Sequence, residues 1–129
     1  MRNRLKISPR KFEQLVAEAL DDLPPFFQDK LENVEVLVQP WPTPHDLRSV
    51  GLSRGHMLLG LYFGIPLTER THAYNLVTPD TITLFQGPIE VVAGKDHEQI
   101  REQVRHTVIH EIAHYFGISD DRLRELDAY

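Results

Sequence analysis

The sequence predicts an α+β domain, in which a small twisted sheet of three or four strands is combined with an N-terminal helix, a long helix in the last third and a short C-terminal helix. Apolar residues recur every three or four positions in residues 9–23 and again in 96–116, as in helices with one buried face. Shorter segments between them are apolar in alternation or throughout, as strands are. The 129 residues correspond to a single domain, 1–129, with one hydrophobic core.

The N-terminal helix is predicted to begin at Ser8 and Pro9, because a serine hydroxyl caps free N–H groups and proline is favoured at the first helical position. Pro24 and Pro25 end it, and a short second turn of helix is expected at 26–31. Its apolar stripe predicts a core-facing surface, which consists of Phe12, Leu15, Val16, Ala19, Leu20 and Leu23.

Three segments are expected to form the sheet. Residues 33–39 (NVEVLVQ) alternate as a half-buried strand does, and the proline-rich stretch that starts at residue 40 is expected to leave the sheet as a loop. Residues 57–63 (MLLGLYF) are apolar throughout, which favours a central strand. Residues 81–85 (TITLF) are rich in β-formers and are the candidate edge strand, and 89–93 is expected to be a short strand or a turn.

The connection from residue 64 to residue 80 has no sustained period. A loop of this length in a small domain is more often functional than not. We therefore expect it to form a wall of a cleft, with Tyr74 as one candidate to reach over the site. Tyr62 and Tyr115 are further candidate donors to an oxyanion, and none of the three tyrosines stands out.

The last third of the chain carries the strongest motif. A helix is predicted from Asp96 until Gly117 stops it, and Ser119 is expected to cap a last short helix. Residues 110–120 read HEIAHYFGISD, so the string HExxHxxGxxD spans the end of this helix and the turn after it. The short form HExxH is a weak signal by itself, whereas the extended string is specific.

This spacing predicts a metal site. Positions four apart on a helix lie one turn above each other, so His110 and His114 can bind the same ion, with Glu111 beside them as general base for a water molecule. A glycine three residues after His114 allows a sharp turn, which favours Asp120 as the third ligand and leaves Asp121 as the alternative. Because the chain has no cysteine, imidazole and carboxylate must supply the ligands, and zinc is the predicted cofactor.

The resemblance to one family extends over nearly the whole chain. The sequence resembles a short prokaryotic family of zincin-like minimal metallopeptidases, also described as acidic metalloproteases, which carry HExxHxxGxxD near the C-terminus. The segments concerned are SPRKFEQLVAEALDDLP, LLGLYFGIPLTER, ITLFQGPIE and VRHTVIHEIAHYFGISDDRL. The motif is also similar to that of the metzincins, which usually have a histidine where Asp120 stands and a methionine turn downstream; Met1 and Met57, the only methionines here, lie upstream. The resemblance implies a zincin-type active-site helix and peptidase activity.

We therefore expect a zinc-dependent hydrolase that cleaves extended peptides by attack of a zinc-bound water, with Glu111 as general base. The peptide would pair with an edge strand, for which residues 81–85 are the candidate. Two alternatives stay open. A metal-dependent endoribonuclease has similar ligand spacing, although a net charge of −5 suits RNA poorly, and a non-enzymatic metal-binding or regulatory module would have no turnover.

Composition limits the expected partners and compartment. The net charge of −5 and the lack of basic clusters outside the N-terminus argue against nucleic-acid binding. The sequence contains no apolar run of membrane-spanning length and no apolar signal segment at its start, and the absence of cysteine suits a reducing cytoplasm. A peptide or protein substrate and a cytoplasmic location are expected, while the oligomeric state is open.

Other histidines and the tryptophan are weaker functional candidates. His106 lies one turn before His110 and could support the site or shuttle protons, but a solvated histidine near Glu102 is favoured. Trp41 is favoured as a ring covering the edge of the core over an exposed recognition residue. The remaining histidines are expected at the surface, namely His45, His56, His72 and His97.

Overall fold

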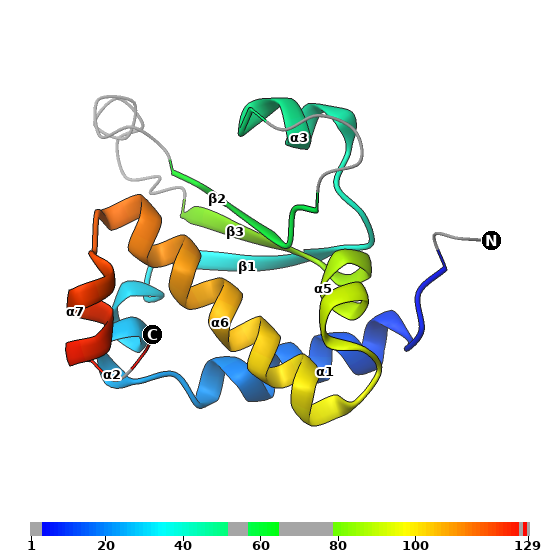
Figure 1. Cartoon of the computed structure of the whole chain (residues 1–129), viewed down its shortest axis with the longest axis horizontal. Helices are drawn as coiled ribbons and strands as arrows, with labels where there is room; N and C mark the ends of the chain where they lie inside the picture. Colours follow the sequence, from blue (N-terminus) through cyan, green and yellow to red (C-terminus); the bar gives the residue numbers. More distant parts are fainter. Residues whose placement is uncertain (1–3, 52–56, 65–78, 127, 129) are drawn as a thin grey trace.

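A three-stranded sheet lies at the centre of the fold, and helices cover one of its faces (Figure 1). The computed structural model describes residues 4–51, 57–64, 79–126 and 128. The predicted α+β class is confirmed. The elements are α1 (Pro9–Asp21), α2 (Pro25–Lys30), β1 (Val34–Gln39), α3 (Pro44–Ser49), β2 (Gly60–Phe63), β3 (Asp80–Phe85), α5 (Gln86–Ala93), α6 (His97–Phe116) and α7 (Asp120–Glu125).

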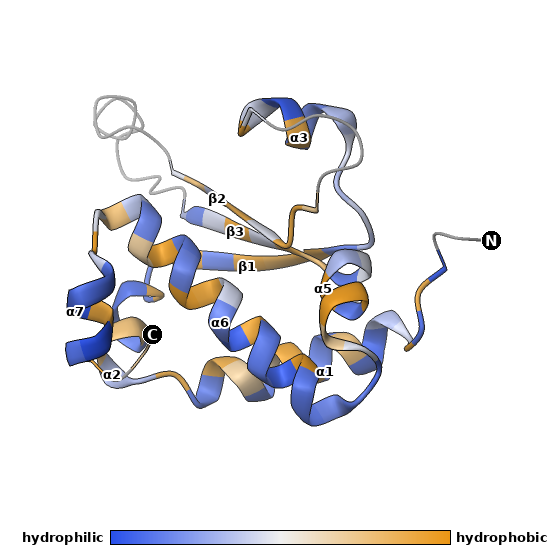
Figure 2. Ribbon diagram, in the orientation of Figure 1, coloured by the Kyte–Doolittle hydropathy of each residue, from blue (hydrophilic) through white to orange (hydrophobic). Residues whose placement is uncertain are grey.

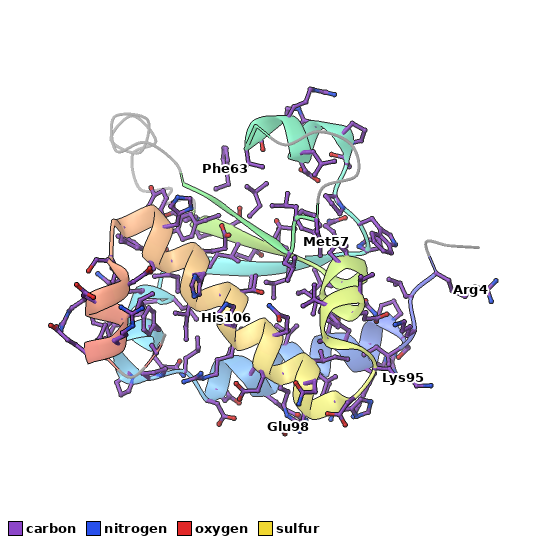
Figure 3. The ribbon with its side chains drawn as sticks, viewed as in Figure 1. Arg4, Met57, Phe63, Lys95, Glu98 and His106 are labelled. Atoms are coloured by element: carbon purple, nitrogen blue, oxygen red, sulfur yellow. The ribbon has the colours of Figure 1, made fainter. Side chains whose placement is uncertain are left out.

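The strand order is β1-β3-β2, with β1 parallel and β2 antiparallel to β3. The assignment of residues 81–85 to the sheet edge is therefore wrong, because β3 pairs on both sides. The expected central position of 57–63 is wrong as well, because in the part of the chain that the structure describes β2 pairs with β3 alone and lies at the edge. Its apolar residues do not all serve a core: Phe63 is 64% exposed and projects from β2 away from α6 (Figure 3).

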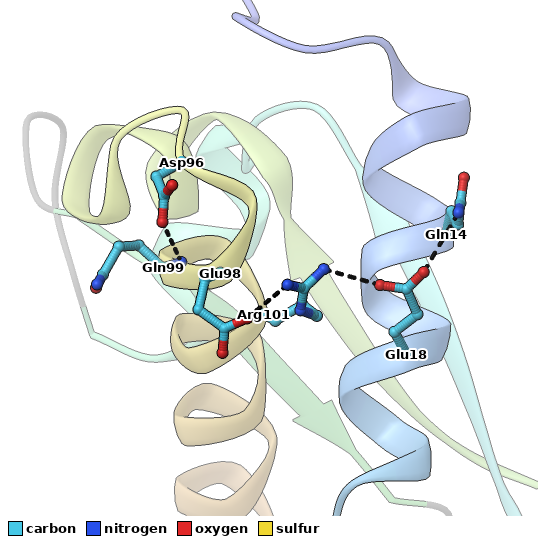
Figure 4. Close-up of polar contacts among 6 residues, drawn as sticks. All are labelled: Gln14, Glu18, Asp96, Glu98, Gln99 and Arg101. Atoms are coloured by element: carbon cyan, nitrogen blue, oxygen red, sulfur yellow. Dashed lines mark hydrogen bonds and ion pairs between the residues drawn. The ribbon is translucent and has the colours of Figure 1, made fainter.

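The helices α1 and α6 pack side by side against the sheet (Figures 1 and 4). Arg101 of α6 joins them, since its guanidinium lies 2.9 Å from Glu18 of α1 and 2.5 Å from Glu98 of α6. Their apolar sides face inward, and Figure 2 shows apolar stretches alternating with polar ones along both helices. The largest side chains without exposed surface in this core include Phe12, Leu15, Ile82, Leu84, Ile100, Ile109 and Ile112.

The predicted caps at Ser8 and Ser119 are confirmed, the latter by the Arg122 N–H that the Ser119 hydroxyl accepts at 3.1 Å, and the structure adds a cap at Asp96. The Ser8 hydroxyl accepts the Lys11 N–H at 3.1 Å, and the Asp96 carboxylate accepts the Gln99 N–H at 3.0 Å.

Among the described residues, no helix has the combination of length and apolarity that crossing a membrane requires.

A short helix, α3, forms where only a loop was expected after residue 40. Thr43 and Asp46 make a reciprocal capping box, in which each side chain accepts the backbone N–H of the other, at 3.0 and 2.8 Å. Pro44 occupies the first helical position, where its missing N–H costs nothing. The proline-rich stretch after β1 therefore ends a strand and also starts a helix. The T-P-x-D pattern of residues 43–46 is the sequence signal for that helix start.

Helix α5 replaces the expected short strand or turn at 89–93. Pro88 favours a break in a strand, but proline is tolerated in the first turn of a helix. The helix is held by a buried carboxylate: Glu90 is 1% exposed and accepts the N–H of Lys6 at 2.5 Å and the Gln86 amide at 2.8 Å. The ring of Trp41 lies against Gly87 where a Cβ would otherwise be, in keeping with its expected place at the edge of the core.

Candidate functional site

The predicted motif lies on the last two turns of α6. This helix begins after Asp96 and ends at Gly117, whose φ of 70° is the left-handed conformation expected of a glycine stop. The apolar side of the same turns is buried, so the helix is fixed on the sheet while His110, Glu111 and His114 lie off the core.

The edge strand β2 contacts the motif directly. The backbone N–H of Tyr62 donates to Oε1 of Glu111 at 3.1 Å. The close approach depends on Gly60, because a Cβ there would lie 2.8 Å from Cγ2 of Thr107 and 3.5 Å from Cγ of Glu111. A residue with no side chain is thus what allows the strand to lie against the helix at the level of the motif.

Gly60→Ala is therefore expected to destabilise the fold and to displace Glu111. The added methyl group overlaps Thr107, whose side chain is buried, so the strand must move away from α6. The expected cost is about 1–3 kcal/mol in the free energy of unfolding, measured by urea denaturation. Gly94→Ala is the matched control for crowding, since a Cβ at that residue meets no atom within 4 Å; its own cost comes only from a positive φ. If Gly60→Ala leaves the free energy of unfolding unchanged, β2 does not need this close approach to α6.

Burial of Glu111 raises the pKa of its carboxyl group above the ordinary value, although the hydrogen bond from the Tyr62 N–H and the charge of His114 both act in the opposite direction. A carboxylate with raised proton affinity is a better acceptor near neutral pH. The site thus holds one carboxylate whose surroundings suit it to proton transfer.

Tyr62 and Tyr115 form one wall of the site. Their rings stack with centroids 4.0 Å apart and an interplanar angle of 18°, and the Tyr62 hydroxyl donates to Oδ2 of Asp80 at 2.6 Å. The Tyr115 ring also lies against the backbone of Gly64, where any Cβ would overlap it. These contacts tie β2, β3 and the end of α6 together around Glu111.

A recess of about 230 Å³ opens beside this wall. Among the described residues it is lined by Val50, Leu61, Tyr62, Glu111, His114 and Tyr115. The structure therefore brings Glu111 and His114 to one surface, as the motif predicted. Val50 follows α3, so sequence reasoning, which expected a loop there, missed this contribution to the site.

The predicted ligands do not all converge. The ring of His110 lies 4.1 Å from that of His106, and Asp120 is exposed at the start of α7. Within the ranges that the structure describes, no three His, Asp or Glu side chains lie close enough to hold a metal ion. The set of His110, His114 and Asp120 stays a prediction. Its donors, two imidazoles and a carboxylate, are nevertheless of the kind that zinc takes in enzymes.

The neighbouring candidates have distinct surroundings. Asp121 pairs with Arg124 at 3.1 Å. Burial, together with the charges of His110 and Arg105, lowers the pKa of His106, while Glu102 acts to raise it. His56, His72, Tyr74 and most of the connection expected to wall the cleft lie outside the described residues.

The chain is similar to known proteins over most of its length. A family model described as zincin-like metallopeptidase matches residues 31–129. The chain is also similar to a solved structure, a conserved hypothetical protein from Thermus thermophilus, with 27% identity and a TM-score of 0.53. That match covers 85% of this chain and 94% of the other. No curated protein matches the sequence.

Proposed function

The chain belongs to the zincin-like metallopeptidase family, and from this premise we propose that it is a zinc-dependent peptidase with Glu111 as its general base. One observation carries the proposal: a partly buried carboxylate of raised pKa lies beside His114 in a recess at the edge of the sheet. On a helix face that is simply solvated, a glutamate would have neither a raised pKa nor a place in a recess.

His110, His114 and Asp120 are the residues that would hold zinc, and their donor types fit it. When bound, zinc lowers the pKa of a water molecule to about 7 and polarises a carbonyl group. The family match implies a metal ion, and we assign the ligands from the motif spacing.

Glu111 would take the proton of the attacking water and pass it to the leaving amine. The Tyr62 N–H holds Oε1 of the carboxylate, which leaves Oε2 to accept the proton. The hydrogen bond also keeps the side chain in one orientation, so that little reorganisation is needed during proton transfer.

An extended peptide would lie along β2. With β3 at the centre of the sheet, β2 is the edge strand that touches Glu111, whereas β1 lies on the other side of β3. Pairing with β2 would place a peptide carbonyl near both Glu111 and His114. We propose a peptide or protein substrate in the cytoplasm, with neither a nucleic acid nor a membrane as partner.

The proposal is tested by metal analysis of the purified protein together with digestion of an unbiased peptide library. One zinc per chain is expected, with cleavage that a chelator removes and added zinc restores. RNA incubated with the same preparation serves as the control for the endoribonuclease alternative and should stay intact. Stoichiometric zinc with an undigested library would contradict the peptidase and favour a metal-binding module.

The third ligand is tested by the two adjacent aspartates. Asp120→Ala is expected to weaken zinc binding severely, whereas Asp121→Ala should leave it unchanged and cost about 1 kcal/mol or less, because it removes an exposed ion pair with Arg124 at the start of α7. Asp120→His should restore binding by supplying a third imidazole. Zinc dissociation constants decide: equal losses at both aspartates, or a loss only at Asp121, would refute Asp120 as ligand.

A further inference from the structure

We infer that the recess beside Glu111 binds one apolar side chain of the substrate, of the branched or aromatic kind, next to the bond that is cleaved. The inference rests on the proposed peptidase function and adds a specificity to it. Glu111 and His114 themselves line the recess, so whatever fills it lies at the reacting bond.

The lining of the recess is mainly apolar although it faces solvent. Val50 comes from the end of α3, Leu61 and Tyr62 from β2, and Tyr115 from α6. Val50 is 43% exposed and Tyr115 48% exposed. Three separate elements bring this apolar surface together beside the proposed catalytic carboxylate. Covering it with another apolar group removes it from water, which favours binding.

The size of the recess suits a single side chain. Its volume of about 230 Å³ is below the range of roughly 300–1,000 Å³ that is usual for sites enclosing a whole small ligand. The stacked rings of Tyr62 and Tyr115 make one side flat, which favours an aromatic ring or a branched aliphatic group lying against it.

The Glu111 carboxylate disfavours an acidic side chain in this place. No lysine or arginine is among the described residues that line the recess, and the Glu111 carboxylate would repel a second carboxylate. The Glu111 oxygen Oε1 is already bound by the Tyr62 N–H. An apolar side chain makes no demand on the remaining oxygen, which the reaction needs.

The first test is cleavage of matched peptides that differ only at the residues flanking the cleaved bond. With zinc-loaded protein, phenylalanine or leucine at one flanking position should raise kcat/KM by about 10-fold or more over aspartate. Val50→Lys should reduce this preference and shift it toward aspartate, because the new ammonium group lies at the recess. The C-terminal end of a helix tolerates a cation, and circular dichroism with zinc content verifies that the variant folds.

Val91→Lys is the matched control. Val91 is 53% exposed on α5, comparable to Val50, and does not line the recess. The Val91→Lys protein should prefer phenylalanine or leucine over aspartate as strongly as the unmodified protein does. Cleavage with no preference for apolar residues, a preference for lysine or arginine, or an identical effect of both substitutions would overturn the inference while the peptidase function stands.

A binding measurement separates the two proposals. N-acetyl-phenylalanine amide and N-acetyl-aspartic acid α-amide, which keeps its side-chain carboxylate, are titrated into the unmodified protein and into Val50→Lys, with NMR chemical shifts as readout. The aromatic amide should bind at least about 10-fold more tightly than the acidic one, and Val50→Lys should abolish the difference. If this holds while no peptide is cleaved, the apolar site is correct and the peptidase function fails; equal binding of both amides refutes the site.

Discussion

Glu111→Gln is expected to lower peptide turnover by about 100-fold or more while zinc stays bound. Glutamine has nearly the same shape and its carbonyl oxygen can still accept the Tyr62 N–H, but it cannot take a proton from water. The substitution therefore separates proton transfer from metal binding. Turnover on a cleavable peptide and zinc content are measured on the same preparation, and unchanged turnover would refute Glu111 as the base.

The stability of the zinc-free variant provides a control with a defined sign. Because burial raises the folded-state pKa of Glu111, ionising it costs folding free energy at neutral pH, and this cost is absent below the unfolded-state value near 4.5. Zinc-free Glu111→Gln should therefore melt at a higher temperature than the unmodified protein at pH 7, with the difference shrinking toward pH 4. A variant that melts lower at pH 7 would show that the ionised carboxylate is well compensated.

His114→Ala is expected to abolish stoichiometric zinc and, with it, all cleavage. Removing one of two imidazoles from the proposed set of three protein ligands would leave too few donors to hold the ion through dialysis. The fold should survive, since His114 is exposed near the end of α6, while Ile112 and Ala113 keep this turn packed on the core. Metal content after dialysis is the measurement.

The matched control is His97→Ala, which removes an exposed histidine from the first residue of the same helix. It should retain one zinc per chain and full activity. A His114→Ala protein that keeps a full equivalent of zinc would show that the motif histidines are not the ligands. Loss of zinc in both variants would instead indicate a nonspecific effect on the helix.

Local patterns are enough to predict the two long helices. The period of apolar residues, the cap at Ser8 and the stop at Gly117 place α1 and α6 within one or two residues of their observed ends. These signals act between residues close in the chain, so they need no knowledge of partners. The same kind of signal is present at Thr43 and Asp46, where the surrounding prolines obscure it because proline also breaks strands.

By itself the sequence determined the α+β class, the course of the motif helix and the presence of Glu111 and His114 on one surface, because helical spacing is a local property. Only the tertiary structure decided which strand is central and which lies at the edge. It also brought the Tyr62 N–H into hydrogen-bond distance of Glu111, 49 residues away in the sequence, and it brought Val50 and Tyr115 to one recess. Strand order and such contacts depend on how apolar faces pack over long separations, and several arrangements of the same segments satisfy the same local periodicity.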